Sequence, residues 1–575
     1  MDKRALARGI AAVALMLAPV PVLAAGPLDN YAPVTQERLE KPEDGNWLQY
    51  RRTYDSWGYS PLSQVNTGNV KDMVPVWSFS TGVNEGHQSP PVVNNGVMFI
   101  TTPQAQVIAL DAKTGDLLWR YKRELPEDLT QLHPTNRGVA LLGDKVYVGT
   151  VDAFIVALDA KTGKPVWEQP VEDYQKGYYI TMAPLAAKGK VMVGMSGGEF
   201  GIRGFLAAFD AETGKPAWKT STIPGPGEPG NETWAGETWK TGGAPVWITG
   251  SYDPATGLSY WGTGNAAPWM ADQRAGDNKW ANSVVAIDVE TGKMKSAHQY
   301  HWNEAWDWDE VAAPILVDVQ RDGRTYKSLV HAGRNGYLWI LERSGDEIKF
   351  VDAKPFVRQN VFKSLDPKTG RPTYDETKVP GTGKRADFCP SLWGGKDWPP
   401  VAYNPQTRLM YIPANENLCG YLEGKQTEYE PGQLYIGVAI SDIGMTVHPD
   451  ADHIGELQAW NLDTGQKVWT QKFDKSQNWG PVLTTGGGLV FMGGTNDRFF
   501  RAFDAKTGDR LWETRTNSGV TGVPVSYEVD GVQYVAVQSG WGVDAQRKQE
   551  KLAQLGYATL DVPQGGVVWV YALRK

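Results

Sequence analysis

The chain has 575 residues, of which 57 are Lys or Arg and 65 are Asp or Glu, so its formal net charge is −8. This length exceeds what one ordinary domain core needs, and the charge excludes a protein that grips a nucleic-acid backbone through a basic surface. The chain holds 64 Gly, 37 Pro and 24 Trp but only two Cys. This composition favours many short strands joined by turns, and it excludes a disulfide-dense scaffold or a zinc site built only from cysteines.

The N-terminus has the pattern of an export signal. A basic start precedes an apolar run over residues 10–23, and a cleavage site of small residues ends at Ala24. A short membrane anchor is the alternative, but two prolines interrupt the run, which is shorter than the ~20 residues that span a bilayer. We therefore predict a cleaved signal peptide over residues 1–24 and an exported mature chain over residues 25–575 with no membrane span.

A short motif then recurs along the chain. In each copy an alternating strand leads into a turn, where an Asp or Asn caps the backbone and a Gly supplies a positive φ. A second strand follows, which ends in Trp in most copies. Such a repeat predicts four-stranded blades around an axis, with the tryptophans packed between neighbouring blades. The clearest copies are ALDAKTGDLLW at 109–119, ALDAKTGKPVW at 157–167, AFDAETGKPAW at 208–218, AIDVETGKMKS at 286–296, AWNLDTGQKVW at 459–469 and AFDAKTGDRLW at 502–512.

The predicted fold is an all-β, eight-bladed propeller in a single domain. Stretches 219–285 and 297–458 are longer than a blade, and we interpret them as blades with long loops on one face, where sites are usually built. The segment VVWVYAL at 567–573 alternates as a strand, so we expect it to pair with N-terminal residues and close the ring. Cys389 and Cys419 either pair, as an oxidising compartment permits, or remain two separate thiols.

Polar residues interrupt the repeat in four segments that are otherwise apolar or small. Carboxylates together with an amide oxygen are ligands for a hard cation, and an Arg beside them suits an oxyanion that forms during a reaction. Each residue has an ordinary alternative: a surface ion pair of Glu199 with Arg203, a turn cap at Asn265, or solvated turn carboxylates. The residues are Glu199 in MSGGEFGIRGF, Asn265 in GTGNAAPW, Asp307 and Asp309 in AWDWD, and Arg334 in HAGRNGYLWIL.

These motifs resemble those of the pyrroloquinoline-quinone (PQQ)-dependent alcohol dehydrogenases, the family that includes methanol and ethanol dehydrogenases. The likeness runs from WLQYRRTYDSWGYSPLSQVNTGNV at 47–70 to the C-terminus, and it includes TNRGVALLGDKVYVGTVDA, SGGEFGIRG, GTGNAAPW, AWDWD and GGKDWPP. The family fold is an eight-bladed propeller whose blades meet through tryptophans, in agreement with the repeat. The resemblance implies a periplasmic enzyme that binds PQQ with one Ca²⁺ or lanthanide ion and oxidises an alcohol by hydride transfer to PQQ.

The resemblance also implies a role for individual residues. Asp307 resembles the catalytic base, Arg334 resembles the arginine beside the reactive carbonyl, and Trp247 resembles the indole that stacks on the quinone. The metal ligands are expected at Glu199, Asn265 and Asp307, with Asp309 as an additional carboxylate. The cofactor contacts are expected at Gln88, Arg137, Thr181, Ser196, Gly197, Gly198, Trp247, Arg334, Asp397, Trp479 and Trp541.

Two features depart from the family pattern. The family has adjacent cysteines shortly before the Asn-Arg-Gly motif, whereas this chain has Gln131-Leu132 there, so one face of the cofactor must be covered differently. Asp309 stands where calcium-type members have a small neutral residue and lanthanide-dependent members have Asp, but PQQ sugar and polyol dehydrogenases also show a WDxD pattern. The choice between Ca²⁺ and a lanthanide stays open, and in the alternative Asp309 turns away and only caps a backbone amide.

Electrons must leave the reduced cofactor for an external acceptor, because the chain has no CxxCH haem motif. The resemblance implies that this acceptor is a soluble c-type cytochrome; a homodimer is left open, and no nucleic-acid partner is expected. Two other functions also stay open. One is a PQQ-dependent sugar or polyol dehydrogenase, favoured by the WDxD pattern and the missing cysteine pair. The other is a non-enzymatic propeller scaffold of the cell envelope, which would lack Glu199, Asn265 and Asp307 as a set.

Overall fold

The computed structural model describes residues 26–557 and 561–574, so the predicted signal peptide lies outside the described residues. Strands dominate the described part, where the α-helices are the short α1 (Gln36–Glu40) and the longer α2 (Val543–Gln554). None of the helices in this part has the length and apolarity that a bilayer crossing needs. The predicted all-β propeller is confirmed, whereas the number of blades stays a prediction.

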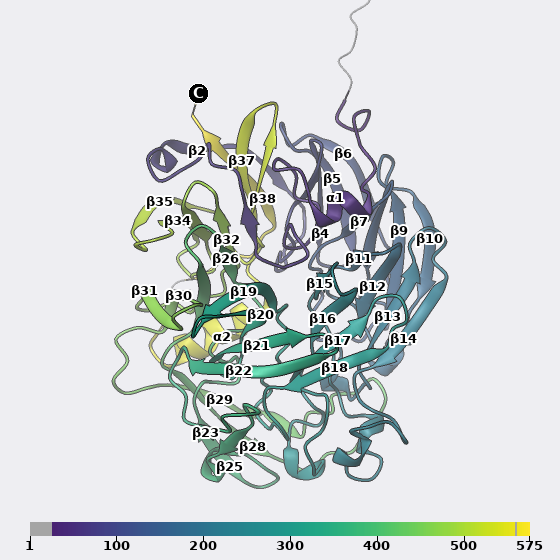
Figure 1. Ribbon diagram of the computed structural model, residues 1–575, viewed down its shortest axis with the longest axis vertical. Helices are drawn as coiled ribbons and strands as arrows, with labels where there is room; N and C mark the ends of the chain where they lie inside the picture. Colours follow the sequence, from purple (N-terminus) through teal and green to yellow (C-terminus); the bar gives the residue numbers. More distant parts are fainter. Residues whose placement is uncertain (1–25, 558–560, 575) are drawn as a thin grey trace, which may run out of the picture.

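Antiparallel sheets follow one another around the molecule in chain order, as the colours of Figure 1 show. In most of them each strand pairs with the next one along the chain, which is the arrangement that the repeat predicts. The first sheet joins β3 (Val92–Asn94), β4 (Val97–Thr102), β5 (Gln106–Asp111) and β6 (Leu117–Lys122), and the next joins β7 (Ala140–Leu142), β8 (Lys145–Gly149), β9 (Phe154–Asp159) and β10 (Pro165–Pro170). The following sheets contain β11 (Leu185–Ala187), β12 (Lys190–Gly194), β13 (Phe205–Asp210) and β14 (Pro216–Ser221); β15 (Ser251–Asp253), β16 (Leu258–Gly262), β17 (Ser283–Asp288) and β18 (Met294–Gln299); and β19 (Ile315–Arg321), β20 (Arg324–Ala332), β21 (Tyr337–Ser344) and β22 (Glu347–Pro355).

The second half of the chain contributes two further large sheets, and the long segment 297–458 adds two small ones. One sheet joins β26 (Ala402–Asn404), β27 (Leu409–Ala414), β30 (Gly455–Asn461) and β31 (Gln466–Phe473), and another joins β1 (Tyr59–Ser60) to β32 (Val482–Thr485), β33 (Leu489–Met492), β34 (Phe499–Asp504) and β35 (Arg510–Arg515). The predicted long segment 297–458 contains, besides β19–β22, the hairpin of β23 (Phe362–Leu365) with β24 (Pro372–Tyr374). It also contains the three-stranded sheet of β25 (Arg385–Phe388), β28 (Leu418–Gly424) and β29 (Val438–Val447).

The two ends of the chain meet in one sheet. It joins β2 (Met73–Ser80) to β38 (Val567–Leu573), which pairs in turn with β37 (Val532–Ser539) and β36 (Val525–Val529). The strands β2 and β38 run antiparallel, with Met73 opposite Leu573 and Ser80 opposite Val567. Figure 1 shows the purple β2 beside the yellow β38. The predicted pairing of segment 567–573 with N-terminal residues is therefore confirmed, and it removes an open edge.

The repeat tryptophans dock on the turn of the following repeat, as predicted. The indole Nε1 of Trp119 donates a hydrogen bond to the carbonyl oxygen of Ala160 at 3.0 Å. Gly163, in the same turn, has φ +69°, and a Cβ at this position would lie 2.4 Å from the Trp119 ring. Glycine is therefore needed both for its backbone conformation and for the close approach of the ring. The same contact recurs between Trp167 and Gly214, Trp218 and Gly292, and Trp469 and Gly508.

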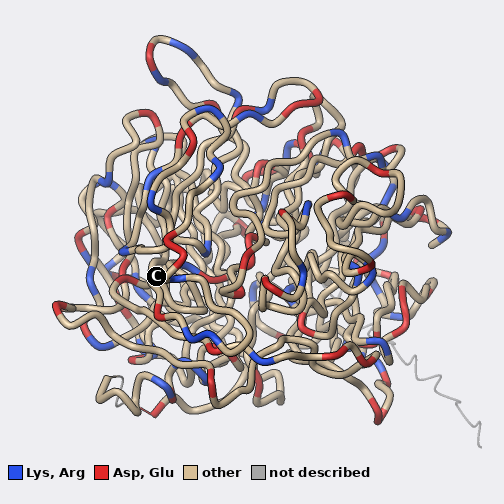
Figure 2. The backbone as a smooth tube through the Cα atoms, turned by 90° about the horizontal axis from the view of Figure 1, so that it is seen from below, with Lys and Arg blue, Asp and Glu red and all other residues tan. Residues whose placement is uncertain are grey.

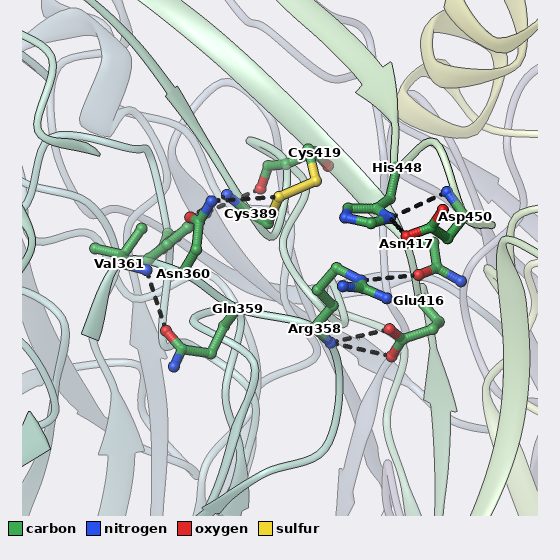
Figure 3. Close-up of a disulfide and its surroundings, with 12 residues drawn as sticks. Arg358, Gln359, Asn360, Val361, Cys389, Glu416, Asn417, Cys419, His448 and Asp450 are labelled. Carbon is green, nitrogen blue, oxygen red and sulfur yellow. Dashed lines mark hydrogen bonds and ion pairs between the residues drawn. A yellow bond between two sulfur atoms is a disulfide. The ribbon is translucent and has the colours of Figure 1, made fainter. Parts of the chain in front are cut away.

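Cys389 and Cys419 form a disulfide, with their Cα atoms 4.2 Å apart. Figure 3 shows the bond beside Asn360, whose side-chain oxygen accepts a hydrogen bond from the backbone N–H of Cys389 at 2.8 Å. The bond joins the segment after β25 to β28, two strands that are already paired. The alternative of two separate thiols is therefore excluded.

Figure 2 shows Lys and Arg interspersed with Asp and Glu along the backbone rather than gathered in one basic stretch.

Candidate functional site

A cavity of about 550 Å³ lies where loops of successive sheets meet α2. This volume is in the usual range for a site that takes a small molecule or cofactor. The lining residues that the sequence predicted as site residues lie either before the first strand of a sheet or between its second and third strands. In an antiparallel sheet both positions lie at the same end, because strand direction alternates. The propeller therefore gathers these loops on one face, although they are far apart in sequence.

Most of the predicted site residues meet in this cavity. Five lie outside its lining, although all five are buried: Gln88, Gly198, Asn265, Trp479 and Trp541. Gly198 and Asn265 form the layer behind the cavity wall, since a Cβ on Gly198 would lie 2.5 Å from the Asn265 amide. The predicted residues in the lining are Arg137, Thr181, Ser196, Gly197, Glu199, Trp247, Asp307, Asp309, Arg334 and Asp397.

Three carboxylates form an acidic cluster in the cavity. Glu199, Asp307 and Asp309 each place one carboxylate oxygen within 4.8 Å of the other two. Arg203, the surface partner considered for Glu199, instead donates to the carbonyl oxygen of Ile223 at 2.6 Å. The sequence alternatives of a surface ion pair at Glu199 and solvated carboxylates at Asp307 and Asp309 therefore do not describe the structure.

Asp309 has two roles at once. Its Oδ1 accepts a hydrogen bond from the backbone N–H of Asn265, which is the amide cap expected if Asp309 were not a metal ligand. Its Oδ2 accepts from Trp247 Nε1 at 3.1 Å and from Arg334 Nη1 at 3.2 Å. Asp309 therefore caps a backbone amide without turning away from the cluster.

The Asn265 side chain lies at the edge of the acidic cluster. In one orientation of its amide, the nitrogen donates to Asp309 Oδ1 at 3.2 Å and the oxygen accepts from Trp269 Nε1 at 3.1 Å. In the opposite orientation the amide oxygen lies against Asp309 Oδ1, an arrangement that a bound cation would stabilise. Asn265 can therefore add a neutral oxygen to the three carboxylates when a cation is bound.

The protonation of the cluster also indicates a cation site. Burial raises the pKa of Asp307 well above its ordinary value; Arg334 opposes this effect, while the carboxylates of Asp309 and Glu199 add to it. Burial also raises the pKa of Asp309 to about 8 and raises that of Glu199. Three acids this close cannot all ionise beside one arginine unless a further positive charge is present. The donor set, three carboxylates and one amide oxygen, fits a hard cation with many oxygen ligands.

Asp307 is held in an uncommon backbone conformation. Its φ is +61°, in the left-handed region that residues other than Gly rarely adopt. The carboxylate of Glu304 accepts hydrogen bonds from the backbone N–H groups of Asp307 at 3.2 Å and Trp308 at 3.2 Å, and so fixes this loop. Asp307 Oδ1 is buried without a hydrogen-bond partner among the described residues. Strain and an unsatisfied carboxylate oxygen at one residue are typical of a functional position.

Arg334 links the acidic cluster to the opposite part of the cavity. Its Nη2 lies 3.5 Å from Asp307 and 3.5 Å from Asp397, while its Nε donates to the carbonyl oxygen of Leu392 at 3.2 Å. Behind it, the buried carboxylate of Glu310 accepts a hydrogen bond from the Arg334 backbone N–H at 3.1 Å. The guanidinium is therefore held by Asp307, Asp397 and the Leu392 carbonyl, and the Arg334 backbone is held by Glu310.

The remaining predicted cofactor residues supply an aromatic wall and unsatisfied polar atoms. The guanidinium carbon of Arg137 lies 4.8 Å from the ring centre of Trp247, and Arg137 Nη1 donates to Thr181 at 2.7 Å. Gln88 Oε1, Arg137 Nε and Trp541 Nε1 are buried without a hydrogen-bond partner within residues 26–557 and 561–574. Buried polar atoms are nearly always hydrogen-bonded. The N–H of Arg137, which lines the cavity, therefore fits an anionic ligand such as the predicted quinone, whereas Gln88 and Trp541 lie behind the lining.

The part of the cavity wall that comes from α2 and from other distant segments was not predicted from the sequence. Leu132, at the second position of the family's cysteine pair, and the following His133 line the cavity. His133 Nε2 lies 3.6 Å from Asp544 in the first turn of α2. The one sequence signal for α2 was its run of good helix formers, VDAQRKQEKLAQ, in an otherwise β-rich chain. The other lining residues not foreseen are Tyr179, Trp269, Leu392, Trp393, Leu434, Ile436, Ile440, Ile443, Arg547, Glu550, Lys551 and Gln554.

Comparisons with known proteins agree with this site. The family model described as a glucose/ethanol/alcohol dehydrogenase β-propeller domain of the PQQ type matches residues 47–369 and 368–535. The quinoprotein alcohol dehydrogenase PedH of Pseudomonas putida is 38% identical over 544 residues, which cover 90% of this chain and 89% of that protein. The lanthanide-dependent methanol dehydrogenase of Methylacidiphilum fumariolicum is 37% identical, with 88% of this chain and 86% of that protein covered.

A solved structure extends the likeness to three dimensions. The structure of a europium-containing methanol dehydrogenase superposes with a TM-score of 0.87 at 36% sequence identity, covering 94% of this chain and all of the other. Both the sequence family and the fold are thus shared over most of the chain. This chain therefore belongs to the family of PQQ-dependent quinoprotein alcohol dehydrogenases.

Proposed function

We propose that the protein is a quinoprotein dehydrogenase that oxidises an alcohol to an aldehyde or ketone, using PQQ and one Ca²⁺ or lanthanide ion. The observation that carries this proposal is the acidic cluster of Glu199, Asp307 and Asp309 beside Arg334 in a cavity of about 550 Å³. When bound, PQQ supplies an electrophilic quinone carbonyl that accepts a hydride, and the cation polarises this carbonyl. A non-enzymatic scaffold is not proposed, since it has no need of a buried acidic cluster.

Asp307 is the proposed general base. Its Oδ1 has no competing hydrogen bond among the described residues, so it can accept the hydroxyl proton of an alcohol. Burial raises the pKa of Asp307, and the nearby guanidinium of Arg334 opposes this rise. A bound cation would add a second positive charge that favours the ionised form a base requires. The same guanidinium offers N–H groups to negative charge that develops beside Asp307.

The cofactor and metal sites are proposed on the predicted residues. Glu199, Asn265, Asp307 and Asp309 would hold the cation, and the three carboxylates carry more negative charge than a divalent ion neutralises, which favours a trivalent lanthanide. Relatives whose names specify lanthanide dependence or bound europium support this choice. Gln88, Arg137, Thr181, Ser196, Gly197, Gly198, Trp247, Arg334, Asp397, Trp479 and Trp541 would hold the quinone.

We also propose the setting in which the enzyme works. Residues 25–575 would form one domain that is exported to the periplasm, and the Cys389–Cys419 disulfide supports an oxidising compartment. A soluble c-type cytochrome would accept the electrons, since the chain carries no haem motif. A homodimer is a further proposal, which sedimentation can test.

The cavity favours alcohols with an apolar body over sugars and polyols. The side chains of Leu434, Ile436, Ile440 and Ile443 line it. Leu434 is 45% exposed and Ile440 is 66% exposed, so this part of the wall reaches the surface. An alkyl or aryl group would bury apolar area there, whereas a second hydroxyl group would lose hydrogen bonds to water.

The experiment is reconstitution of the purified protein with PQQ and either Ca²⁺ or a light lanthanide, followed by a dye-linked assay. The substrates are primary alcohols of increasing chain length, glycerol and glucose. We expect activity that requires both PQQ and the metal, with a higher kcat/KM for the longer alcohols than for glycerol or glucose. Preference for glucose or glycerol would favour the polyol alternative, and absence of turnover with every substrate would overturn the enzymatic proposal.

A further inference from the structure

A buried lysine on α2 lies next to the cofactor residues. Lys548 is four residues after Asp544 and three before Lys551, both of which line the cavity, so the three side chains share one face of the helix. Lys548 is fully buried, and its ammonium group lies 5.4 Å from the ring centre of Trp479. Trp479 is itself a predicted cofactor contact, although the sequence pointed to no role for Lys548.

The ammonium group of Lys548 has no hydrogen-bond acceptor in the part of the chain that the structure describes. The other buried lysines of that part differ in this respect. Lys145 lies 2.9 Å from the carboxylates of both Asp144 and Glu212, and Lys396 donates to the carbonyl oxygen of Asp397 at 2.6 Å. Within residues 26–557 and 561–574, Lys548 is therefore the buried lysine without an acceptor.

An unpaired buried ammonium is unfavourable, because it loses its hydration without gaining a counter-ion. The face of Trp479 compensates only in part. Asp397 attracts the charge and Arg334 repels it, but Asp397 already lies 3.5 Å from Arg334. Burial lowers the pKa of Lys548 to about 7, in line with this missing partner. Lys548 and Trp479 lie behind the cavity lining, so Lys548 is a buried positive group next to the site that calls for an anion from outside the chain.

We propose that Lys548 is a cofactor-binding residue whose ammonium group is the counter-charge for a carboxylate of bound PQQ, a tricarboxylic acid. This inference rests on the proposed PQQ site and extends it to α2. The helix thereby contributes to cofactor affinity as well as to the cavity wall. It also adds a charged contact to a site that lacks the cysteine pair of its family.

The test compares wild type, Lys548→Met and a control, Lys467→Met, which removes an exposed lysine of β31. Two quantities are measured: the Kd for PQQ from quenching of tryptophan fluorescence, and the Tm of the PQQ-free protein. We expect Lys548→Met to raise the Kd about 10- to 100-fold, as for loss of a charged hydrogen bond. Its PQQ-free Tm should stay equal or rise, because an uncompensated buried charge has been removed. Lys467→Met should match wild type in both.

A second ligand separates charge from shape. The trimethyl ester of PQQ carries no carboxylate charge, so wild type and Lys548→Met should bind it with equal Kd. An unchanged Kd for PQQ in Lys548→Met would overturn the inference, and so would a lowered Tm with equal losses for PQQ and its ester. Failure of Lys548→Met to fold would also contradict it. If wild type itself does not bind PQQ, the proposed function fails and this inference fails with it.

Discussion

Asp307 combines the features that a general base in this cavity needs. Its backbone has a positive φ, Glu304 fixes its loop, and its Oδ1 is buried without a hydrogen-bond partner among the described residues. These features serve no evident folding purpose, since a residue in an ordinary conformation with a bonded side chain would be more stable. They are consistent with a carboxylate kept available for a substrate proton.

Replacement of this carboxylate tests the role directly. Asp307→Asn should lower kcat by about 10²- to 10⁴-fold in protein loaded with PQQ and metal, because the amide cannot accept the alcohol proton. Steady-state dye-linked kinetics measure the loss, and cofactor content is checked in the same sample. Asp318→Asn, an exposed position on β19, is the matched control and should be unaffected. Near-normal kcat in loaded Asp307→Asn protein would contradict the assignment.

Asp309 is the residue on which the choice of metal depends. Asp309→Ala removes one of three carboxylates, so the remaining charge suits Ca²⁺ better than a trivalent ion. We expect lanthanide-supported activity to fall at least about tenfold more than Ca²⁺-supported activity, which corresponds to about 1.4 kcal/mol. Because both assays use the same variant, loss of the Asp309 bonds to Asn265 and Trp247 affects both equally. Equal losses with the two ions would remove the reason to prefer a lanthanide.

At the scale of elements, the contact between a repeat tryptophan and the next turn stabilises the interfaces between sheets. Gly163 and Gly189 form a matched pair for testing this contact, because both have positive φ, +69° and +71°. A Cβ on Gly163 would lie 2.4 Å from the Trp119 ring, whereas a Cβ on Gly189 meets no atom within 4 Å. The pair therefore separates backbone strain from the loss of docking.

Gly189→Ala should lower stability by about 1–2 kcal/mol from backbone strain alone. Gly163→Ala should cost about 1–3 kcal/mol more, because the added methyl group displaces the docked indole. Thermal unfolding followed by tryptophan fluorescence measures both variants. If the two variants lose the same stability, the tryptophan contact does not contribute as described.

The repeat made the elements predictable, whereas the contacts between distant segments left no local signal. The Asp and Thr-Gly turn and the terminal Trp stand within eleven residues of each other in copies such as 109–119, so sequence alone predicts both the hairpin and the docking. The predicted pairing of segment 567–573 follows from its alternation. The contact of His133 with Asp544 depends instead on how α2 lies against a loop more than 400 residues away in the sequence. The burial of Lys548 depends on how α2 packs near Trp479. No periodicity encodes such a contact.

At the scale of the whole molecule, the acidic cluster links stability to pH. The folded protein without a cation holds protons that the unfolded chain releases, since the pKa of Asp309 rises from 3.8 to about 8. Between these two values the native state binds more protons, so its stability falls as pH rises. We expect the Tm of chelator-treated protein to drop from pH 5 to pH 8, and saturation with Ca²⁺ or a lanthanide to reduce that slope. A flat or rising Tm in the metal-free protein would contradict this linkage.

The central claim is that one cation sits in the Glu199, Asp307 and Asp309 cluster of a PQQ-loaded enzyme. The most direct test is anomalous diffraction from crystals of the protein grown with PQQ and a lanthanide. The account predicts a single strong anomalous peak within coordination distance of oxygens of Glu199, Asp307, Asp309 and Asn265, with quinone density against Trp247. A peak at another position, or an empty cluster in crystals that contain the cofactor, would contradict it.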